Sequence, residues 1–209
     1  MKIRVVETGA FFENCYIIWG SPDQAIVVDP GDDAALIMDD LRKNGLTPSA
    51  YFLTHGHIDH ISALDGLLAA FPATVYLNRE DAAWAFSNLN AIPPYLPLKK
   101  TPDVLDTDLH EGRLIEAGPL KARVICTPGH TPGGVCFAFD DNAVLVSGDT
   151  LFSGSIGRTD FQGGSMRKMR DSLAALMELD DAYQVLPGHG EATTIGAERA
   201  NNPYIAKLG

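Results

Sequence analysis

"THGHIDH", residues 54–60, stands at the end of a short apolar run, "AYFLT" (50–54), and carries three histidines and one aspartate. At the end of an extended strand, residues two apart point to the same side, so His55 and His57 can approach one metal ion together. Gly56 between them lets the backbone turn without a side-chain clash. The stretch therefore predicts a metal-binding loop that follows a strand.

Asp59 and His60 lie in the same stretch and open a predicted helix over about residues 59–70. From that position they point away from the first two histidines, toward a neighbouring second ion. Imidazole and carboxylate together suit zinc, iron or manganese, and no thiolate is required. The alternative interpretation is a polar turn in which Asp59 caps the helix.

Three distant residues occupy comparable positions in the sequence. His130 and His189 each follow a Pro-Gly pair, in "TPGH" and "LPGH", and Asp149 ends an apolar run in "SGDT". Each of them alone also fits a simpler role, as a turn histidine or as an aspartate bonded to backbone amides. Their occurrence together with "THGHIDH" favours a shared metal centre. The remaining histidine, His110 in "TDLHEGR", is expected to be a solvent-exposed bystander.

Apolar runs and turn signals predict a layered α/β protein. The predicted strands lie at residues 2–8, 15–19, 25–29, 50–54, 73–78, 120–127, 134–140, 142–149 and 183–188. The predicted helices are one capped by Asp32 or Asp33 that runs to about residue 44 before Gly45, and others at 59–70, 79–88, 165–179 and 193–201. The proline-rich stretch 91–102 is expected to be an exposed loop that either covers a pocket or tucks its own apolar residues away.

Five of the predicted strands end in a polar cluster: "VVDPG", "FLTHGH", "VICTPGH", "LVSGD" and "VLPGHG". Functional residues of layered α/β proteins gather on the loops at one end of the strands. We therefore expect these clusters to meet at one shared edge of a sheet.

The composition is typical of an ordinary soluble globular protein. The chain has 209 residues, of which 45% are hydrophobic and 21% charged, which fits a single domain. A net charge of −11 disfavours nucleic acid as a partner. No apolar run approaches the roughly 20 residues of a membrane span, and the first 15 residues lack the apolar core of a signal peptide. We therefore expect a cytoplasmic protein without a membrane partner.

The three cysteines do not form a disulfide framework. Cys15, Cys126 and Cys136 are odd in number, have no paired spacing and lie in apolar, strand-like stretches. They are expected to be buried small hydrophobic residues.

The motifs HxHxDH, TPGHTPG, SGDTLF and PGHG, in this order, resemble the metallo-β-lactamase fold superfamily. Within it, the chain is most similar to the hydroxyacylglutathione hydrolases, the glyoxalase II group, over essentially its whole length, including "VVDPG" and "GRTDF". The resemblance implies a four-layer αβ/βα sandwich, with two mixed β-sheets flanked by helices. It also implies one domain over residues 1–209, without the helical C-terminal glutathione-binding domain of the longer glyoxalase II enzymes.

The resemblance also implies roles for individual residues. One ion is expected to be held by His55, His57 and His130, the other by Asp59, His60 and His189, with Asp149 bridging both. Asp29 is expected to orient the "THGH" loop through hydrogen bonds. The cofactor is then a pair of divalent ions, with zinc expected and iron or manganese as alternatives.

Such a centre indicates hydrolysis. Two ions of this kind lie roughly 3.5–4 Å apart. A water molecule between them becomes a hydroxide nucleophile at neutral pH, since even one zinc ion lowers the pKa of water to about 7. Asp59 can orient this nucleophile. A thioester is a suitable substrate, because a thiolate leaves without a strong general acid.

The expected substrate is a small thioester linked to glutathione, of the S-hydroxyacylglutathione type. Arg158 of "GRTDF" is the candidate that binds it, as a bidentate partner for a carboxylate. Asp160 stands where the family has a tyrosine, so an ion pair between Arg158 and Asp160 is an equal alternative. The oligomeric state is not predicted.

Other activities fit parts of the pattern. "GRTDF" also resembles the persulfide dioxygenases, which use a single iron on the set formed here by His55, His57, His130 and Asp149. A lactonase or a β-lactam hydrolase of the same fold is a further alternative. A metal-stabilised binding protein is less consistent with seven ligands that include no closed set of cysteines.

Overall fold

Strand β2 (Glu13–Trp19) shows how the sequence builds the layers, because its two faces are buried in different cores. The computed structural model describes residues 1–92 and 100–208. Cys15 and Ile17 contribute to one hydrophobic cluster, whereas Tyr16 and Ile18 contribute to another. Side chains alternate across a strand, so an unbroken apolar run requires cover on both faces.

The first sheet has six strands in the order β1-β2-β3-β4-β5-β6. Strands β1, β2 and β3 pair antiparallel, and β3 to β6 pair parallel, so the sheet is mixed. Besides β2, its members are β1 (Lys2–Thr8), β3 (Gln24–Val28), β4 (Thr47–Phe52), β5 (Thr74–Tyr76) and β6 (Leu105–Asp106).

The second sheet also has six strands, in the order β14-β13-β10-β9-β8-β7. All its pairs are antiparallel except the parallel pair of β10 and β13. Its members are β7 (Leu114–Ala117), β8 (Leu120–Cys126), β9 (Val135–Phe139), β10 (Val144–Gly148), β13 (Gln184–Pro187) and β14 (Thr193–Thr194). A separate small hairpin joins β11 (Leu151–Phe152) to β12 (Ser155–Ile156).

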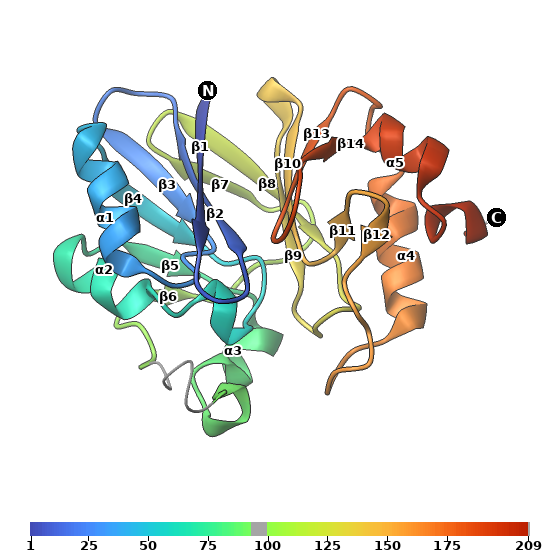
Figure 1. Cartoon of the computed structure of the whole chain (residues 1–209), viewed down its shortest axis with the longest axis horizontal. Coiled ribbons are helices and arrows are strands. Elements are labelled where there is room, and N and C mark those ends of the chain that lie inside the picture. The colour runs from blue at the N-terminus through green and yellow to red at the C-terminus, as the bar shows by residue number, and fades with distance from the viewer. Residues whose placement is uncertain (93–99, 209) are drawn as a thin grey trace.

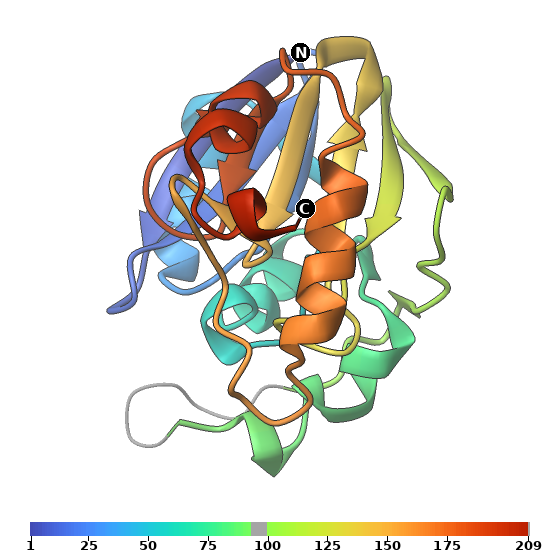
Figure 2. The same cartoon turned by 90° about the vertical axis from the view of Figure 1, so that its right-hand side faces the viewer.

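Helices cover the outer faces of both sheets (Figure 1). Helices α1 (Ala34–Lys43) and α2 (Leu64–Ala70) lie on the first sheet, and α3 (Arg79–Ala85) follows β5. Helices α4 (Met166–Leu176) and α5 (Ile195–Asn201) cover the second sheet, and Figure 2 shows them in front of its strands. Four one-turn 3₁₀ helices complete the description: η1 (Ile58–His60), η2 (Asn88–Asn90), η3 (Asp140–Asn142) and η4 (Ile205–Lys207).

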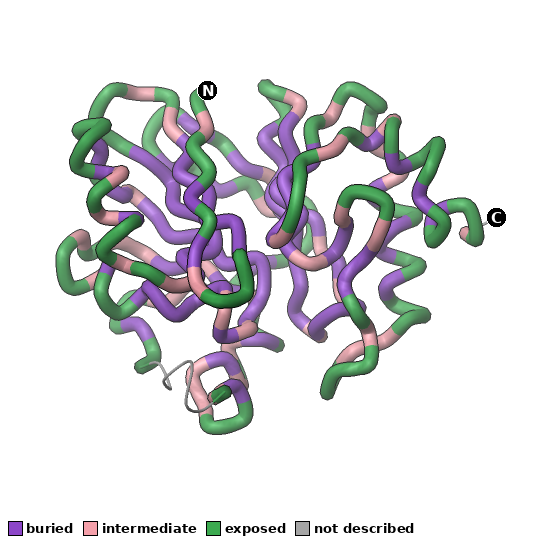
Figure 3. Tube along the Cα trace, viewed as in Figure 1, coloured by how far each residue is buried: buried purple, intermediate pink, exposed green. Residues whose placement is uncertain are grey.

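Three hydrophobic clusters fill the spaces between the layers. One lies between the first sheet and its helices, one between the two sheets, and one between the second sheet and α4 and α5. Between the sheets, the rings of Phe52 and Phe137 lie 4.7 Å apart, centroid to centroid. The tube in Figure 3 shows this buried centre along the strands and the exposed outer turns of the helices. Truncating such a phenylalanine to alanine costs about 3–5 kcal/mol of stability.

This architecture confirms the predicted fold class of two mixed sheets flanked by helices. The predicted helix over 59–70 is wrong in part, because the chain forms η1, leaves the helix at Ile61 and re-enters it in α2. Ala63 instead donates its N–H to the carbonyls of Pro30 and Gly31. This break turns Asp59 and His60 toward the other ligands rather than along a continuous helix.

Smaller differences from the prediction concern helix ends and short strands. Asp33 stands at the N-cap of α1, but its carboxylate accepts the Gly9 N–H instead of capping the helix. Helix α5 begins only after Thr194, whose hydroxyl caps it. The short strands β6, β7, β11, β12 and β14 were not predicted. Most of the predicted loop 91–102 lies outside the described residues.

The polar clusters at the strand ends do come together, but the expectation of one shared sheet edge is wrong. The loops that carry Asp29 and His55 follow β3 and β4 of the first sheet. The loops that carry His130, Asp149 and His189 follow β8, β10 and β13 of the second sheet. The two sheets therefore contribute facing edges to one site. In the described part of the chain, no helix is long and apolar enough to cross a membrane.

Candidate metal centre

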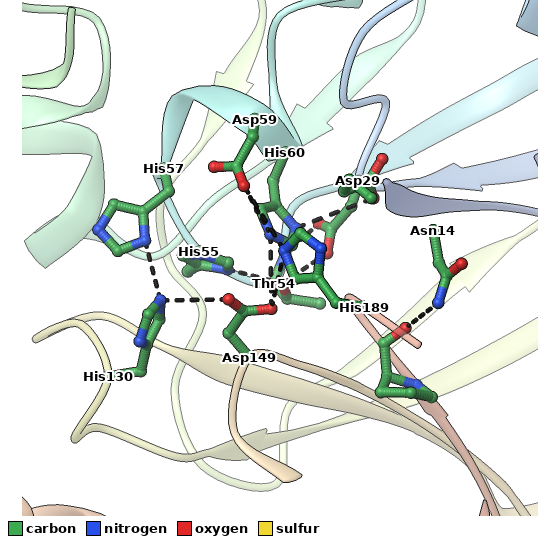
Figure 4. Close-up of polar contacts among 12 residues, drawn as sticks. Asn14, Asp29, Thr54, His55, His57, Asp59, His60, His130, Asp149 and His189 are labelled. Atoms are coloured by element: carbon green, nitrogen blue, oxygen red, sulfur yellow. Dashed lines mark hydrogen bonds and ion pairs between the residues drawn. The ribbon is translucent and has the colours of Figure 1, made fainter. Parts of the chain in front are cut away.

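The first group of potential metal ligands combines one loop from each sheet. His55, His57 and His130 each place a ring nitrogen within 4.8 Å of the others. The Nε2 atom of His130 lies 2.9 Å from Nδ1 of His57 (Figure 4). Histidine nitrogens that converge in this way offer their lone pairs to a common point, as a shared metal ion requires.

The second group lies beside the first. Asp59, His60 and His189 also bring their ligand atoms within 4.8 Å of one another. Nε2 of His189 is 3.5 Å from Oδ2 of Asp59, and Nε2 of His60 is 3.9 Å from the same oxygen. The group mixes imidazole with carboxylate, which suits zinc, iron or manganese.

Asp149 lies between the two groups and faces both (Figure 4). Its Oδ2 atom is 3.4 Å from Nε2 of His130. Its Oδ1 atom is 3.5 Å from Nε2 of His60 and 3.7 Å from Nε2 of His189. One carboxylate oxygen is thus directed to each group.

The donor atoms fit a pair of metal ions on their own geometry. Nε2 of His55, Nε2 of His60 and Oδ1 of Asp149 are buried and have no hydrogen-bond partner among residues 1–92 and 100–208. Leaving such a polar atom unpaired costs about 1–3 kcal/mol, so three of them in one place are consistent with a metal-binding role. The clusters therefore suggest a di-metal site.

Oxygen atoms behind the imidazoles fix which nitrogen faces the centre. Nδ1 of His60 donates to Oδ2 of Asp29 at 3.1 Å, and Nδ1 of His130 donates to the carbonyl of Arg158 at 2.7 Å. Nδ1 of His189 donates to the Phe11 carbonyl at 3.1 Å. In each ring the Nε2 lone pair is left for a metal, the usual arrangement of metal-binding histidines.

Asp29 also organises the loop before the ligands. Its Oδ1 accepts the Thr54 N–H at 2.7 Å, and its Oδ2 accepts the Thr54 hydroxyl at 2.6 Å. Asp29 itself has a positive φ of 46°, at the turn after β3. The Asp29 carboxylate therefore lies behind the "THGH" loop and forms the hydrogen bonds that the resemblance implied.

The pKa values of His55 and His57 shift in the opposite direction to that of His60. Burial, followed by the neighbouring imidazoles, lowers the pKa of His55 well below its usual value and that of His57 to about 3. Burial also opposes a charge on His60, but Asp149, Asp59 and Asp29 together raise its pKa well above the usual value. A neutral imidazole is the metal-binding form; burial favours it at His55 and His57, and metal binding at His60 would release a proton.

Sequence comparison agrees with this geometry. The family profile described as Metallo-beta-lactamase superfamily matches residues 8–189, which include both ligand groups. The chain belongs to the metallo-beta-lactamase superfamily. The fold and the metal-binding groups support a hydrolase activity for this superfamily member.

Several curated proteins resemble this superfamily member over nearly their full length. An uncharacterized protein of Mycobacterium tuberculosis is 38% identical, covering 100% of this chain and 99% of its own. The probable metallo-hydrolase YqgX of Bacillus subtilis is 35% identical, and hydroxyacylglutathione hydrolase GloC of Haemophilus influenzae is 31% identical. Both of these alignments cover 98% of each chain.

Three solved structures that are similar to this chain represent differently named proteins. The BLEG-1 B3 metallo-beta-lactamase is 34% identical with a TM-score of 0.89, covering 98% of this chain and 99% of its own. TTHA1623 in a di-iron-bound form is 34% identical with a TM-score of 0.80, covering 96% and 99%. ETHE1 from Myxococcus xanthus is 29% identical with a TM-score of 0.78, covering 99% and 85%.

Arg158 lies beside the candidate metal centre, but its side chain is bonded to a neighbouring residue. The guanidinium forms two hydrogen bonds of 2.8 Å to the Asp160 carboxylate and lies 4.0 Å from the centroid of the Phe161 ring. Both Arg158 and Asp160 are exposed, so a substrate carboxylate can compete for the guanidinium. A role in substrate binding stays a prediction.

Residues of β2 hold the His189 loop, and sequence analysis did not identify them. The Asn14 side chain donates to the carbonyls of Pro187 at 3.0 Å and Gly190 at 2.9 Å, and the Tyr16 hydroxyl donates to the Pro187 carbonyl at 2.6 Å. The one available signal is a polar pair, Glu13 and Asn14, that opens an otherwise apolar strand. Asn14 is drawn beside the centre in Figure 4.

The predictions for the three cysteines and for His110 are mostly confirmed. Cys15 and Cys136 are buried free thiols, whereas Cys126 is only half-buried. Burial raises the pKa of all three thiols. His110 lies away from the centre on the surface, where its ring is 3.3 Å from Asp108.

Proposed function

We propose that the chain is a dinuclear metallo-hydrolase that cleaves small thioesters of the S-hydroxyacylglutathione type. The observation that carries this proposal is the position of Asp149, whose two oxygens face two complete ligand groups. The similarity to hydroxyacylglutathione hydrolase GloC over 98% of each chain supports the substrate class.

The ligand assignment follows the two groups of side chains. His55, His57 and His130 would hold one ion, Asp59, His60 and His189 the other, and Asp149 both. When bound, two divalent ions supply a nucleophile from water at neutral pH and stabilise the negative charge that develops on a carbonyl oxygen. Zinc is the expected metal, with iron supported as an alternative by the similar chain TTHA1623 in its di-iron form.

Asp59 is the proposed catalytic residue among the ligands. Burial disfavours its charge, but His60 and His189 hold the pKa of Asp59 below its usual value. An ionised carboxylate at this position accepts a hydrogen bond from the attacking water and orients it toward the substrate carbonyl. The leaving thiolate is stable enough to depart without a separate general acid.

Aromatic side chains around the centre favour a substrate with an apolar part beside the scissile bond. The rings of Trp84 and Phe161 each lie 5.4 Å from His57, centroid to centroid. On the other side, the ring of Phe152 lies 6.3 Å from that of His189. Arg158 supplies a cationic partner for a carboxylate of glutathione, next to Phe161.

A β-lactam hydrolase is the second candidate. It is favoured by the similarity to the BLEG-1 B3 metallo-beta-lactamase, at 34% identity and a TM-score of 0.89. The single-iron persulfide dioxygenase suggested by "GRTDF" requires only the first ligand group and Asp149. The completeness of the second group supports the two-ion hydrolase over it.

The test is a substrate panel on purified protein with quantified metal. S-lactoylglutathione should release free thiol, faster than a β-lactam is opened or a glutathione persulfide is oxidised, with close to two ions per chain. No thiol release at millimolar substrate would remove the leading assignment. Persulfide oxidation by protein with one iron, or rapid β-lactam opening, would establish one of the alternatives.

A further inference from the structure

Helix α3 contains a buried carboxylate that reaches both loops of the first ligand group. Asp81 is 0% exposed. Its Oδ2 atom accepts the Gly56 N–H at 2.9 Å, and its Oδ1 atom accepts the Gly133 N–H at 2.7 Å. Gly56 separates His55 from His57, and Gly133 follows closely after the third ligand. One side chain therefore links the two loops that must meet at the first ion.

The two glycines permit this close approach. A Cβ atom on Gly56 would lie 2.9 Å from Cβ of Ala85 and 3.3 Å from Cβ of Asp81. A Cβ atom on Gly133 would lie 2.8 Å from both the backbone nitrogen and Oδ1 of Asp81. Contacts under 3 Å would force the loops away from the helix. The glycines of "HGH" and "TPGG" are thus explained by α3 as well as by the turns.

A second side chain, that of Asn90, binds the carbonyl group of Gly56. Asn90 is buried, and its amide donates to the carbonyls of Gly56 and Ala85, both at 2.7 Å. The N–H of Gly56 is therefore fixed by Asp81 and its carbonyl by Asn90. The peptide between the first two histidines has little freedom to rotate.

The buried charge has a cost that packing alone does not justify. In the described part of the chain, two backbone N–H groups donate to the Asp81 carboxylate, and no cationic side chain forms an ion pair with it. Burial raises the pKa of Asp81, and hydrogen bonds from the Thr131 side chain, from the N–H groups of Gly133 and Gly56 and from the Trp84 side chain act in the opposite direction. A buried ion without a counter-ion costs several kcal/mol. The Asp81 carboxylate instead serves to join the loops of Gly56 and Gly133.

The second ligand group is held by other residues. The His189 loop is bonded to Asn14 and Tyr16 of β2, and His60 is bonded to Asp29 at the end of β3. None of these contacts passes through α3.

We propose that Asp81 is a positioning residue for His55, His57 and His130, so that the affinity for the ion in this group depends on Asp81. The affinity for the ion held by Asp59, His60 and His189 does not. The inference rests on the two-ion centre proposed above, but it is independent of the substrate.

The test measures metal affinity in variants that retain one group each. His189→Ala leaves the first group intact and His57→Ala leaves the second, and each is titrated with Zn²⁺ against a chelator. Asn at position 81 keeps one oxygen and turns an NH₂ group toward the other loop's N–H. D81N should therefore weaken zinc binding about 10–100-fold in the His189→Ala background. It should leave zinc binding unchanged in the His57→Ala background.

Two further variants separate positioning from a general loss of stability. Glu198 is another buried carboxylate, and it accepts the Gly154 N–H at 2.9 Å and the Asn202 amide at 2.8 Å in the α5 region. E198Q should lower the melting temperature without changing either zinc affinity. N90A, which frees the carbonyls of Gly56 and Ala85 but keeps both hydrogen bonds to Asp81, should weaken the same ion as D81N to a smaller extent, and it serves if D81N does not fold.

Absorption of Co²⁺-loaded protein supplies a readout of ligand geometry. In the His189→Ala background, D81N and N90A should change the visible bands of bound Co²⁺, whereas E198Q should not. Equal weakening of both ions, no change in the His189→Ala background, or the same shift with E198Q would each overturn the proposal. A failure to cleave thioesters would leave these outcomes unaffected and would count against the proposed function alone.

Discussion

The two ligand groups sit side by side but are supported by different parts of the fold. His55, His57 and His130 are held from α3, a short helix outside the sheets, by Asp81. The second group is held from the first sheet, by Asn14 and Tyr16 of β2 and by Asp29, the residue that follows β3. The first group therefore depends on a helix outside the sheets in addition to the bonds between Asp29 and Thr54, whereas the second group depends on the strands and strand ends alone.

Burial adds to this difference. The side chain of His130 is 6% exposed and that of His189 is 27% exposed. The first group lies deeper, next to Trp84 and Phe161, and the second opens toward the turn between β1 and β2. Metal exchange at the second group is thus expected to be easier for the solvent to reach, although its protein support is firmer.

The largest expected effect comes from the residue that belongs to both groups. Asp149→Ala removes an oxygen directed at each group, so both ions should be lost together, and kcat/KM should fall by more than about 100-fold. Metal analysis and thioester turnover measure the two results. D171N, a change of an exposed carboxylate on α4, is the matched control. If two ions remain bound and the rate survives, the bridging role is wrong.

Asp29→Asn is expected to have the next largest effect, on the second group directly through His60 and on the first group indirectly through Thr54. The change weakens the hydrogen bonds to Thr54 and His60, and each bond to a charged group contributes about 1.5–3 kcal/mol. The free energy of unfolding and the affinity for the second ion should therefore decrease together. Chemical denaturation with and without a chelator measures both. A loss confined to the first ion would contradict the division between the groups.

Arg158→Ala should have a smaller effect, limited to the substrate. The His130 ring is bonded to the backbone carbonyl of residue 158, which the change retains, so metal content should stay the same. A contact shared by the ground state and the transition state raises KM when it is removed, here about tenfold, with little change in kcat. Steady-state kinetics with a glutathione thioester measure this. An unchanged KM would indicate that Arg158 serves only its ion pair with Asp160.

The smallest effect is expected far from both groups, at the pair of Asp106 and Arg113. Hydrogen bonds from the guanidinium, at 2.7 and 2.8 Å, hold the pKa of Asp106 below its usual range. The pair therefore contributes about 0.5–1 kcal/mol above the unfolded-state pKa near 4, and the contribution disappears as the pH falls through the folded-state pKa. D106N should lower the free energy of unfolding by this amount at pH 7 and should not change it at the lowest pH. Its metal content should equal that of the unaltered protein. Denaturation at several pH values measures it, and a change in metal content would contradict it.

The sequence predicted the side chains that converge at the candidate centre far better than the residues that support them. His55, His57, His130, Asp149 and His189 stand in loops marked by Gly and Pro after apolar runs, and that pattern is local. In the sequence, Asp81 resembles any acidic residue in the first turn of a helix. The N–H groups that it binds belong to Gly56 and Gly133, which are distant in the chain. Asn14 is likewise defined by contacts with Pro187 and Gly190 that no local pattern encodes.

Two errors in the structure predicted from the sequence have the same origin: both depend on contacts between distant residues. The strand ends were assigned to one sheet edge because a sequence does not show which strands share a sheet. The helix over 59–70 is interrupted because the N–H of Ala63 finds carbonyl partners in the β3–α1 turn, and this tertiary contact overrides a continuous apolar pattern.

The hydrogen bonds from Asn14 and Tyr16 to Pro187 join residues 173 and 171 positions apart. During synthesis on the ribosome, these β2 side chains emerge long before the loop that they bind. The three histidines of the first group and Asp149 are all translated earlier than His189. Metal loading of the nascent polypeptide is therefore expected to be sequential, with the second ion acquired only after the loop of His189 has emerged and bonded to β2.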